Sequence, residues 1–508
     1  MNENILKLQN GSDIRGIAID GVEGEYVNLT EDITTKIGSA FISWLSKKTG
    51  KQAKELTVGV GRDSRVTGET LANALMQGII STGAKVINCN MATTPAMFMS
   101  LIFEQTKFDG SAMITASHLP FNRNGIKFFD IDGGLEHEDI TEILSIANEI
   151  PEDYLELTLN KKFANEIKNI DLISIYAEYL KNKISDGIGN TNKPLDGIHI
   201  VVDSGNGSSG FFVDKILKPL GANTTGSQFL KPDGMFPNHI PNPENKEAMN
   251  SIRNAVLTNK ADFGLIFDTD VDRMSAVLSD GSEINRDSII AMVAATLAPE
   301  YPGSTIITDS VTSNRLTYFL EKVLGLKHLC YMRGYKNVIN KCKELNSKGI
   351  VSPLAMETSG HGALKDNYYL DDGAFLAVKL IIALANASKE GKKLDSLIKE
   401  LPPLAEEAEY RFKIKDENFS EYGKKVLVEF KERAEKLNYN IPQSFEGIRI
   451  NFDSEEIQGW ILLRMSLHDP VMPMNIEGGR IGDLKKLEKI AQILTDGFEK
   501  LDRSSLTK

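Results

Sequence analysis

The sequence predicts an α/β protein: three consecutive α/β domains with mixed, mostly parallel sheets, and a smaller C-terminal α+β domain. Short runs rich in Val and Ile recur, and several end in a polar cluster followed by helical periodicity, the pattern of βαβ units. A chain of 508 residues is long enough for about three or four domains. After Pro402 and Pro403 the pattern changes to separate strand-like segments and charged helices, which indicates an α+β unit.

The expected elements follow this order. The strands expected in the first three domains are Leu56–Val60, Ile198–Val202, Phe263–Phe267 and Thr305–Ile307. In the last domain we expect strands within residues 407–414, 446–452 and 459–466, a helix over 420–436 and a final helix from about residue 482. We place boundaries near residues 168, 284 and 403, which gives domains 1–168, 169–284, 285–403 and 404–508. No fixed-period repeat is evident.

Composition excludes several classes of partner. The formal net charge of −12 would repel the phosphates of nucleic acid and anionic lipid. The three cysteines lack both disulfide-framework number and metal-ligand spacing, so we expect a reducing cytoplasm. The longest apolar stretch, near Ile289–Ala298, is well short of the ~20 residues of a membrane span, and the N-terminal segment has no apolar signal core. We therefore expect no membrane segment.

Three aspartates follow the strand expected at Phe263–Phe267: Asp268, Asp270 and Asp272, with Arg273 directly after them. Carboxylates at i, i+2 and i+4 lie on one side of an extended segment, and a curving loop would bring their oxygens together. Two such charges about 4 Å apart repel by about 4 kcal/mol at an effective dielectric of about 20, so convergence requires a cation. Oxygen ligands favour Mg²⁺, Mn²⁺ or Ca²⁺ over zinc. An EF-hand does not fit, because Arg273 stands where its loop needs glycine; a solvated acidic turn is the alternative.

A second polar cluster, Thr115–Pro120, contains Ser117 and His118 and precedes an Asn- and Gly-rich stretch that ends at Lys127. A serine in such a turn can act as a nucleophile or phosphate carrier. A serine hydrolase is a poor fit, because adjacent Ser and His do not readily form a directed pair and no G-x-S-x-G elbow surrounds them. A capped turn is the structural alternative.

Two further clusters suit ligand recognition. Glu357, Ser359 and His361 follow an apolar run and could hydrogen-bond sugar hydroxyls, or form an ordinary strand-to-helix cap. Arg464 and Ser466 offer a guanidinium and a hydroxyl near a turn, as an anion site would, or an exposed cap at the end of a strand.

The residues Gly205–Gly210 match the dinucleotide fingerprint G-x-G-x-x-G. The match is weak, because the preceding strand already ends in Asp203 and no acidic residue stands near position 230. An NAD-dependent oxidoreductase is therefore kept only as a third hypothesis. The P-loop pattern is absent from the sequence.

Taken together, the clusters resemble those of the α-D-phosphohexomutase superfamily, which includes phosphoglucomutases, phosphomannomutases and phosphoglucosamine mutases. The resemblance spans nearly the whole chain and implies three α/β domains and a smaller fourth around a central cleft. The motifs that carry it are, in order, GSDIRG (11–16), GRDSR (61–65), TASHLPFNRNGIK (115–127), PDGMFPNHIPNPE (232–244), DTDVDR (268–273), RGYKNV (333–338), METSGH (356–361) and RMSLHDP (464–470).

The resemblance also implies residue roles. Ser117 would be carried as a phosphoserine, with one Mg²⁺ per chain held against it. The metal ligands implied are Ser117, Asp268, Asp270 and Asp272. The catalytic residues implied are Ser117, Arg15, His118, Arg273 and Lys127, the last as a candidate proton shuttle. The substrate-binding residues implied are Glu357 and Ser359 for sugar hydroxyls, His361 in the pocket wall, and Arg464 and Ser466 for the phosphate that is not transferred.

The chain departs from the family pattern at three places. Leu119 replaces the usual asparagine after Ser-His, and Met356 stands where a glycine often precedes the sugar-contacting glutamate. Residues 467–469 replace the Gly-Thr-Glu of the usual phosphate loop, with loss of glycine's backbone freedom. We expect Arg480 just downstream to supply a replacement contact to phosphate.

Our leading hypothesis is a Mg²⁺-dependent mutase that interconverts hexose 1-phosphate and hexose 6-phosphate through a phosphoserine enzyme and a bisphosphorylated sugar. Glucose or mannose phosphates are preferred, glucosamine phosphate is the second choice, and a hexose bisphosphate is the expected activator. A diverged sugar-phosphate-binding protein without turnover is the alternative from another class. We expect a small-molecule sugar phosphate as partner, neither nucleic acid nor membrane, and a monomer or homodimer.

Overall fold

The computed structural model describes residues 5–151, 167–189, 192–466 and 469–506. The chain divides into two compact units: Met1–Asn285 with Ser359–Asp395, and Arg286–Thr358 with Ser396–Lys508. None of the helices in the described ranges combines the length and hydropathy that crossing a lipid bilayer requires. The domain boundaries at 168, 284 and 403 stay predictions.

The first sheet of the first unit has eight strands among the described residues. Their order is β1-β2-β6-β5-β3-β4-β8, with β7 beside β6. Strands β5, β3, β4 and β8 are parallel to one another, and β6 pairs antiparallel with both β2 and β5. The strands are β1 (Gln9–Asn10), β2 (Asp13–Ile17), β3 (Thr57–Arg62), β4 (Lys85–Met91), β5 (Gly110–Ile114), β6 (Arg123–Asp130), β7 (Gly133–Gly134) and β8 (Lys168–Asn169).

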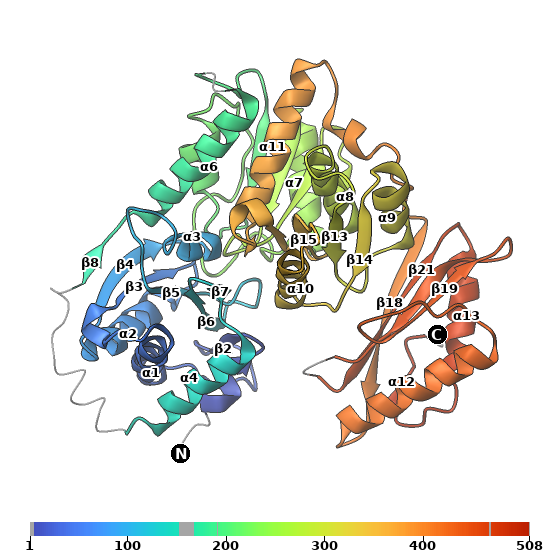
Figure 1. Ribbon diagram of the computed structural model, residues 1–508, viewed down its shortest axis with the longest axis horizontal. Helices are drawn as coiled ribbons and strands as arrows, with labels where there is room; N and C mark the ends of the chain where they lie inside the picture. Colours follow the sequence, from blue (N-terminus) through green and yellow to red (C-terminus); the bar gives the residue numbers. More distant parts are fainter. Residues whose placement is uncertain (1–4, 152–166, 190–191, 467–468, 507–508) are drawn as a thin grey trace. The chain divides into compact units, whose positions relative to one another are not determined.

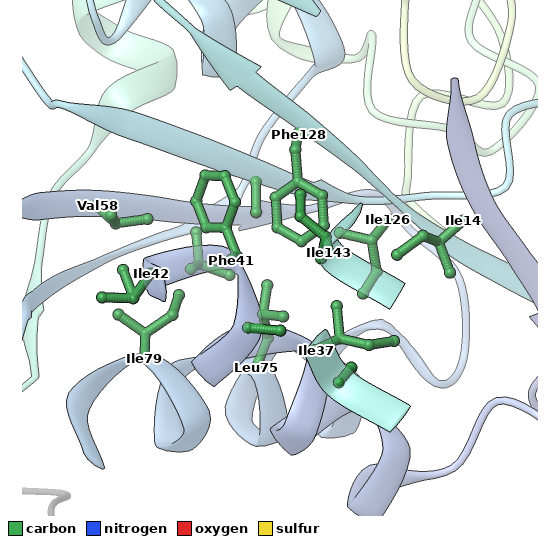
Figure 2. Packing of buried hydrophobic residues seen from close by; sticks show 14 of the residues in the cluster. Ile14, Ile37, Phe41, Ile42, Val58, Leu75, Ile79, Ile126, Phe128 and Ile143 are labelled. Atoms are coloured by element: carbon green, nitrogen blue, oxygen red, sulfur yellow. The ribbon is translucent and has the colours of Figure 1, made fainter. Parts of the chain in front are cut away.

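Helices α1 (Glu31–Thr49), α2 (Gly68–Ser81) and α4 (His137–Glu149) lie together on one face of this sheet (Figure 1). Their apolar sides form a core in which Phe41 stacks on Phe128 with ring centroids 4.2 Å apart (Figure 2). The shorter helices of this region are η1 (Ile5–Leu8), η2 (Ala53–Glu55) and α3 (Thr94–Met99). The core includes Ala112 and Ile114, so it holds β5 in place up to the last residue of the strand.

The second sheet of the first unit has the order β12-β11-β10-β9, with β9 and β10 parallel and the other pairs antiparallel. Its strands are β9 (Ile200–Asp203), β10 (Phe263–Phe267), β11 (Met274–Leu278) and β12 (Glu283–Ile284). The helices of this part are α6 (Leu172–Ile188), η3 (Phe212–Leu217) and α7 (Lys246–Asn259). The chain returns to this unit with β16 (Gly362–Leu364), η5 (Lys365–Asn367), β17 (Leu370–Asp371) and α11 (Gly373–Lys389), and α11 packs against α6.

In the second unit, β13 lies between β14 and β15, and all three strands are parallel. The elements of this part are α8 (Arg286–Leu297), β13 (Thr305–Thr308), α9 (Asn314–Tyr318), η4 (Phe319–Val323), β14 (Lys327–Cys330), α10 (Tyr335–Ser347) and β15 (Leu354–Met356); η6 (Leu394–Ile398) follows later in the chain.

The C-terminal part of the second unit is an antiparallel sheet with the order β19-β20-β21-β18-β22. Helices α12 (Phe419–Lys436) and α13 (Asp483–Thr495) pack on it through a common apolar core (Figure 1). The strands are β18 (Glu406–Ile414), β19 (Ile448–Asp453), β20 (Gln458–Leu463), β21 (Val471–Gly478) and β22 (Leu501–Asp502). This is the α+β domain that the sequence predicts.

Candidate active site

The turn that carries Ser117 and the aspartate loop meet within the first unit. Ser117 follows β5, and the loop Asp268–Arg273 connects β10 to β11. The Ser117 hydroxyl donates a hydrogen bond to Asp268 Oδ2 at 2.9 Å, although 151 positions separate the two residues. Both side chains are at least nine-tenths buried. The structure thus places a hydroxyl and a carboxylate where one ion can contact both.

The carboxylates of Asp268, Asp270 and Asp272 converge, with one oxygen of each within 4.8 Å of the others. The loop turns through Val271, whose φ of +70° is rare for a β-branched residue. Thr94, at the start of α3, helps to hold the loop in this conformation. Its main-chain N–H donates to the Asp270 carbonyl at 2.9 Å, and its hydroxyl donates to Asp270 Oδ2 at 2.5 Å. A strained main-chain conformation at a functional site persists only where contacts from the surrounding structure hold it in this way.

Charge in this loop is unevenly shared. Lys127 on β6 pairs with Asp270 Oδ2 at 3.2 Å and makes a still closer contact with Asp272. Burial, reinforced by the two neighbouring carboxylates, raises the pKa of Asp268 well above its ordinary value. Burial also acts to raise the pKa of Asp272, but Lys127 and His361 outweigh it and hold that pKa well below its ordinary value. Asp268 therefore holds a proton more tightly than an ordinary aspartate, and Asp272 holds one less tightly.

Two carboxylate oxygens in the loop, Asp270 Oδ1 and Asp272 Oδ1, are buried without a hydrogen-bond partner. Leaving a buried acceptor unsatisfied costs about 1–3 kcal/mol or more for a charged group. A hard divalent cation with oxygen ligands would satisfy both oxygens, so the donor set fits Mg²⁺.

A second set of possible metal ligands shares Asp272 and adds His361 and Asp371. His361 Nε2 lies 3.5 Å from Asp272 Oδ1 and 3.6 Å from Asp371 Oδ2. Its imidazole would suit a transition metal rather than Mg²⁺. The three aspartates therefore remain the better match to a magnesium ion.

Arg273 connects this loop to the serine turn. Its Nη2 donates to Ser117 Oγ at 2.8 Å, to Asp268 Oδ2 at 3.2 Å and to His118 Nδ1. Burial, with Arg273 as the next cause, lowers the pKa of His118 to about 2. Ser117 Oγ lies 3.4 Å from His118 Nδ1, but Arg273 Nη2 approaches the same nitrogen more closely. Because Arg273 already donates to that nitrogen, the imidazole cannot serve as the base of a serine hydrolase.

Arg15, on β2, lies beside the strand that leads to Ser117. Its guanidinium donates to the carbonyl of Thr115 and to Asp13 Oδ2, the latter at 2.8 Å. The side chain is about one-eighth exposed. Arg15 therefore adds positive charge close to the serine turn.

Of the expected sugar contacts, Ser359 and His361 belong to the first unit. Ser359 Oγ lies 3.0 Å from His361 Nδ1, and the main chain of His361 forms a bridge with that of Arg273. Gly360 between them has φ +93°, and a Cβ there would lie 2.6 Å from the Met274 carbonyl oxygen. Glycine therefore allows this loop to pack against β11.

Glu357 and Arg464 belong to the second unit. Glu357 follows β15, is buried, and accepts a hydrogen bond from the Gly334 N–H at 2.6 Å. Arg464 follows β20, and its Nη1 lies 3.7 Å from Glu446 Oε1. Glu446 was not predicted from the sequence, and it also accepts from the main-chain N–H of Arg333.

The geometry contradicts Arg480 as a replacement phosphate contact. Gly459 pairs with Gly478 and Leu463 with Met474, so Arg480 and Arg464 lie at opposite ends of the β20–β21 pair. The four steps from Gly459 to Leu463 alone correspond to about 14 Å, and both arginines lie beyond these ends. Arg480 Nε instead donates to Asp483 Oδ2 at 3.0 Å, at the start of α13. Ser466 accepts from the Asp469 N–H at 3.2 Å, and the departures at 467 and 468 lie outside the described residues.

Sequence reasoning missed Thr94, which contacts Asp270 from 176 positions away. A signal was available: Thr93, Thr94 and Pro95 form a polar, helix-starting cluster directly after a strand, the same pattern that identified the other clusters.

The glycines of Gly205–Gly210 have a structural explanation. The Ser208 N–H donates to the Thr269 carbonyl at 2.9 Å, and a Cβ on Gly207 would lie 2.8 Å from the Thr269 carbonyl oxygen. The loop therefore packs against the aspartate loop, and the short helix η3 follows it. This removes the basis of the oxidoreductase hypothesis.

Comparisons with known proteins decide the family. Models of phosphoglucomutase/phosphomannomutase α/β/α domains I, II and III match residues 7–153, 174–281 and 285–404. A phosphoglucomutase/phosphomannomutase of Thermococcus kodakarensis is 32% identical over 502 residues, covering 97% of each chain. The chain belongs to the phosphoglucomutase/phosphomannomutase family. It is thus a member of the α-D-phosphohexomutase superfamily and a hexose-phosphate mutase, an isomerase.

Other relatives widen the comparison. A phosphoglucosamine mutase of Lactobacillus helveticus is 28% identical, covering 78% of this chain and 82% of its own. The crystal structure of a phosphoglucomutase/phosphomannomutase family protein from Burkholderia thailandensis has a TM-score of 0.73 at 24% identity, covering 97% of this chain and 98% of its own. That similarity supports the fold of three α/β domains and a β-rich fourth.

Proposed function

We propose that this mutase interconverts hexose 1-phosphate and hexose 6-phosphate, with glucose or mannose phosphate preferred, through a phosphoryl group carried on Ser117. The contact of Ser117 Oγ with Asp268 Oδ2 at 2.9 Å and Arg273 Nη2 at 2.8 Å is the observation that carries the proposal. In the first transfer, the bond from phosphorus to Ser117 Oγ breaks and a bond to a sugar hydroxyl forms, which gives a hexose bisphosphate. The second transfer returns the other phosphate to Ser117.

The side chains around Ser117 suit these transfers. Asp268, Asp270 and Asp272 would hold Mg²⁺, which supplies positive charge to the transferring phosphoryl oxygens. Arg273 donates to the departing Ser117 oxygen and stabilises charge that develops there. Each transfer also moves one proton between the sugar hydroxyl and Ser117.

Lys127 is our candidate for relaying that proton. Burial acts to lower its pKa, but Asp270 and Asp272 outweigh burial and hold the pKa well above its ordinary value. Lys127 is therefore an ammonium group in this structure, the form from which a relay would give up a proton.

Recognition of the sugar phosphate would fall to Glu357, Ser359 and His361 for hydroxyls, and to Arg464 and Ser466 for the other phosphate. Some relatives are named phosphoglucosamine mutases, so glucosamine phosphate is the second candidate substrate. A hexose bisphosphate is the expected activator, since it would load phosphate onto Ser117.

Intact-mass analysis of Ser117→Ala and wild type tests the carrier. We expect a fraction of the wild type to carry one phosphoryl group, Ser117→Ala to carry none, and turnover of the variant to fall at least about 10³-fold. The control is Ser145→Ala, which removes an exposed hydroxyl on α4. An active Ser117→Ala variant would refute the proposal.

Assays of glucose, mannose and glucosamine 1-phosphates with Mg²⁺ and a trace of the matching bisphosphate then rank the substrates. Fastest turnover of glucosamine phosphate would select the second candidate. Failure of all three would indicate the diverged binding protein.

A further inference from the structure

Arg65, which follows β3, points its guanidinium into the turn that carries Ser117. Nη2 donates to the carbonyls of Ser117 (2.5 Å) and Leu119 (2.6 Å). Nη1 donates to the carbonyls of Pro120 (2.8 Å) and Arg123 (2.9 Å). The residue is 2% exposed. All four of these hydrogen bonds go to the main chain, so Arg65 determines the shape of the turn.

The turn needs such support. Ser117 has φ +50°, a left-handed conformation that costs a residue with a Cβ about 1–2 kcal/mol. The carbonyls of Ser117, Leu119 and Pro120 converge on one point, where their negative ends repel one another. A planar guanidinium with several donors in a fixed geometry satisfies such a group, and an ammonium group does so less well.

A second path reaches the same turn through Asp63. Its Oδ1 accepts from the Arg65 N–H at 2.9 Å, and its Oδ2 accepts from the Thr115 hydroxyl at 2.7 Å. The Thr115 hydroxyl in turn accepts from the Ser117 N–H at 2.9 Å. Asp63 and Thr115 are fully buried. The main chain of Ser117 is therefore held on its N–H side and its carbonyl side by one network.

Residues 232–244, which we call the strap, cover this network. The Phe236 ring lies over the Arg65 guanidinium, with Cζ 5.3 Å from the ring centroid, a cation–π distance. Gly234 lets the strap approach closely, because a Cβ there would be only 2.4 Å from the Val66 nitrogen. The strap thus covers one face of the Arg65 guanidinium.

The same strap reaches the second guanidinium that contacts Ser117. Asn242 Oδ1 accepts from Arg273 Nη1 at 3.4 Å, and Glu244 Oε2 lies 3.9 Å from the same nitrogen. Between its two contacts the strap is anchored by His239, whose Nε2 lies 3.0 Å from Asp203 Oδ1. One segment therefore supports both the main-chain and the side-chain contacts of Ser117.

We propose that Arg65 is a positioning residue for phosphoryl transfer: clamped by the strap, it fixes the turn so that Ser117 Oγ stays in line with the sugar hydroxyl. The inference rests on the proposed role of Ser117 as phosphoryl carrier. Since Arg65 acts on the main chain of the turn, its loss changes the rate of transfer more than the binding of sugar phosphate.

Arg65→Ala, assayed with and without millimolar guanidinium chloride, tests the proposal. We expect kcat to fall about 100-fold, the effect of displacing a reacting group by roughly 1 Å, with KM changed less than about 3-fold. Guanidinium ion should enter the vacated space and restore part of kcat. The control is Arg411→Ala, which removes an exposed arginine of β18 that pairs with Glu409 at 3.2 Å, and which guanidinium should not affect.

The outcomes separate this inference from the proposed function. Suppose that Ser117→Ala is inactive, while Arg65→Ala keeps kcat within about 2-fold of wild type or changes only KM. Positioning by Arg65 is then wrong, and the carrier role of Ser117 stands. The same holds if folded Arg65→Ala is slow but guanidinium restores nothing. An active Ser117→Ala variant would rule out both the carrier role of Ser117 and positioning by Arg65. If Arg65→Ala does not fold, Phe236→Leu decides: we expect an about 5-fold lower kcat at unchanged KM, and a normal kcat would overturn the proposal.

Discussion

The arginine beside the serine turn and aspartate loop differs from Arg464 in its hydrogen bonding. In the first unit, Arg273 makes hydrogen bonds of 2.8 and 3.2 Å to Ser117 and Asp268. In the second unit, Arg464 approaches Glu446 only to 3.7 Å, and its buried Nε has no hydrogen-bond partner. Arg273 is thus hydrogen-bonded to the groups proposed to perform chemistry, whereas Arg464, proposed to recognise substrate, has a donor nitrogen without a partner.

This difference follows from the two tasks. A group that stabilises a transition state is most effective when its position is fixed before the reaction begins. A group that binds phosphate gains most when its donors have no strong partner to give up. Substitutions in the first region should therefore act mainly on kcat, and those in the second mainly on KM.

Asp270→Asn should have the largest effect. It removes one charged ligand from the three converging carboxylates, and we expect kcat at subsaturating Mg²⁺ to fall at least about 10³-fold. Kinetic titration with Mg²⁺ and calorimetric binding measure the loss. Asp280→Asn, in the turn after β11, is the control. Unchanged Mg²⁺ affinity in Asp270→Asn would place the ion elsewhere.

Arg464→Gln should have an intermediate effect of the other kind. We expect KM for hexose phosphate to rise about 10- to 100-fold, with a smaller change in kcat, because a charge-assisted contact to phosphate is lost. Steady-state kinetics measure both constants. Arg411→Gln, an exposed arginine of β18 that pairs with Glu409, should leave both unchanged. A drop in kcat at constant KM would break the contrast between the two regions.

Glu477→Gln on β21 should have the smallest effect, and only on stability. Burial raises the pKa of Glu477 to about 7, from an ordinary value of 4.5. The folded protein therefore binds this proton more tightly than the unfolded chain, and the associated stability is present below about pH 4.5 and lost as pH rises through about 7. Glutamine cannot ionise and still accepts from the Ser313 hydroxyl.

Thermal unfolding at two pH values checks this prediction. At pH 8.5 we expect the variant to be more stable by about 1–3 kcal/mol, a rise of a few degrees in Tm, and at pH 4.5 we expect no difference. Exposed Glu455 provides the control Glu455→Gln. An equal shift at both pH values would show that ionisation of Glu477 is not the cause.

Much of the fold could be predicted because local patterns determine it. The strand expected at 263–267 is β10, and the helix expected at 420–436 is α12, which starts one residue earlier. Clusters at strand ends also located Ser117 and the aspartates. Periodicity and strand-end position are local properties, whereas the meeting of these two clusters is not, because β5 and β10 belong to different sheets.

The remainder depends on register and on main-chain contacts. Arg480 follows a strand like the other candidates, and only the pairing of β20 with β21 shows that it lies far from Arg464. Arg65 binds carbonyl oxygens, which every residue carries, so no pattern of side chains reveals its target. Glu446 lies in the turn before β19, and no spacing rule predicts that this turn brings its carboxylate near Arg464.

The strap also has a consequence for biosynthesis. Arg65 and Ser117 leave the ribosome well before Phe236, which covers the Arg65 guanidinium. A nascent chain that ends before the strap therefore presents the serine on a turn whose Arg65 guanidinium lacks the Phe236 ring. The contacts that Asp268 and Arg273 make with Ser117 come from still later in the sequence, so the complete surroundings of this serine form only after residue 273 has been made and folded.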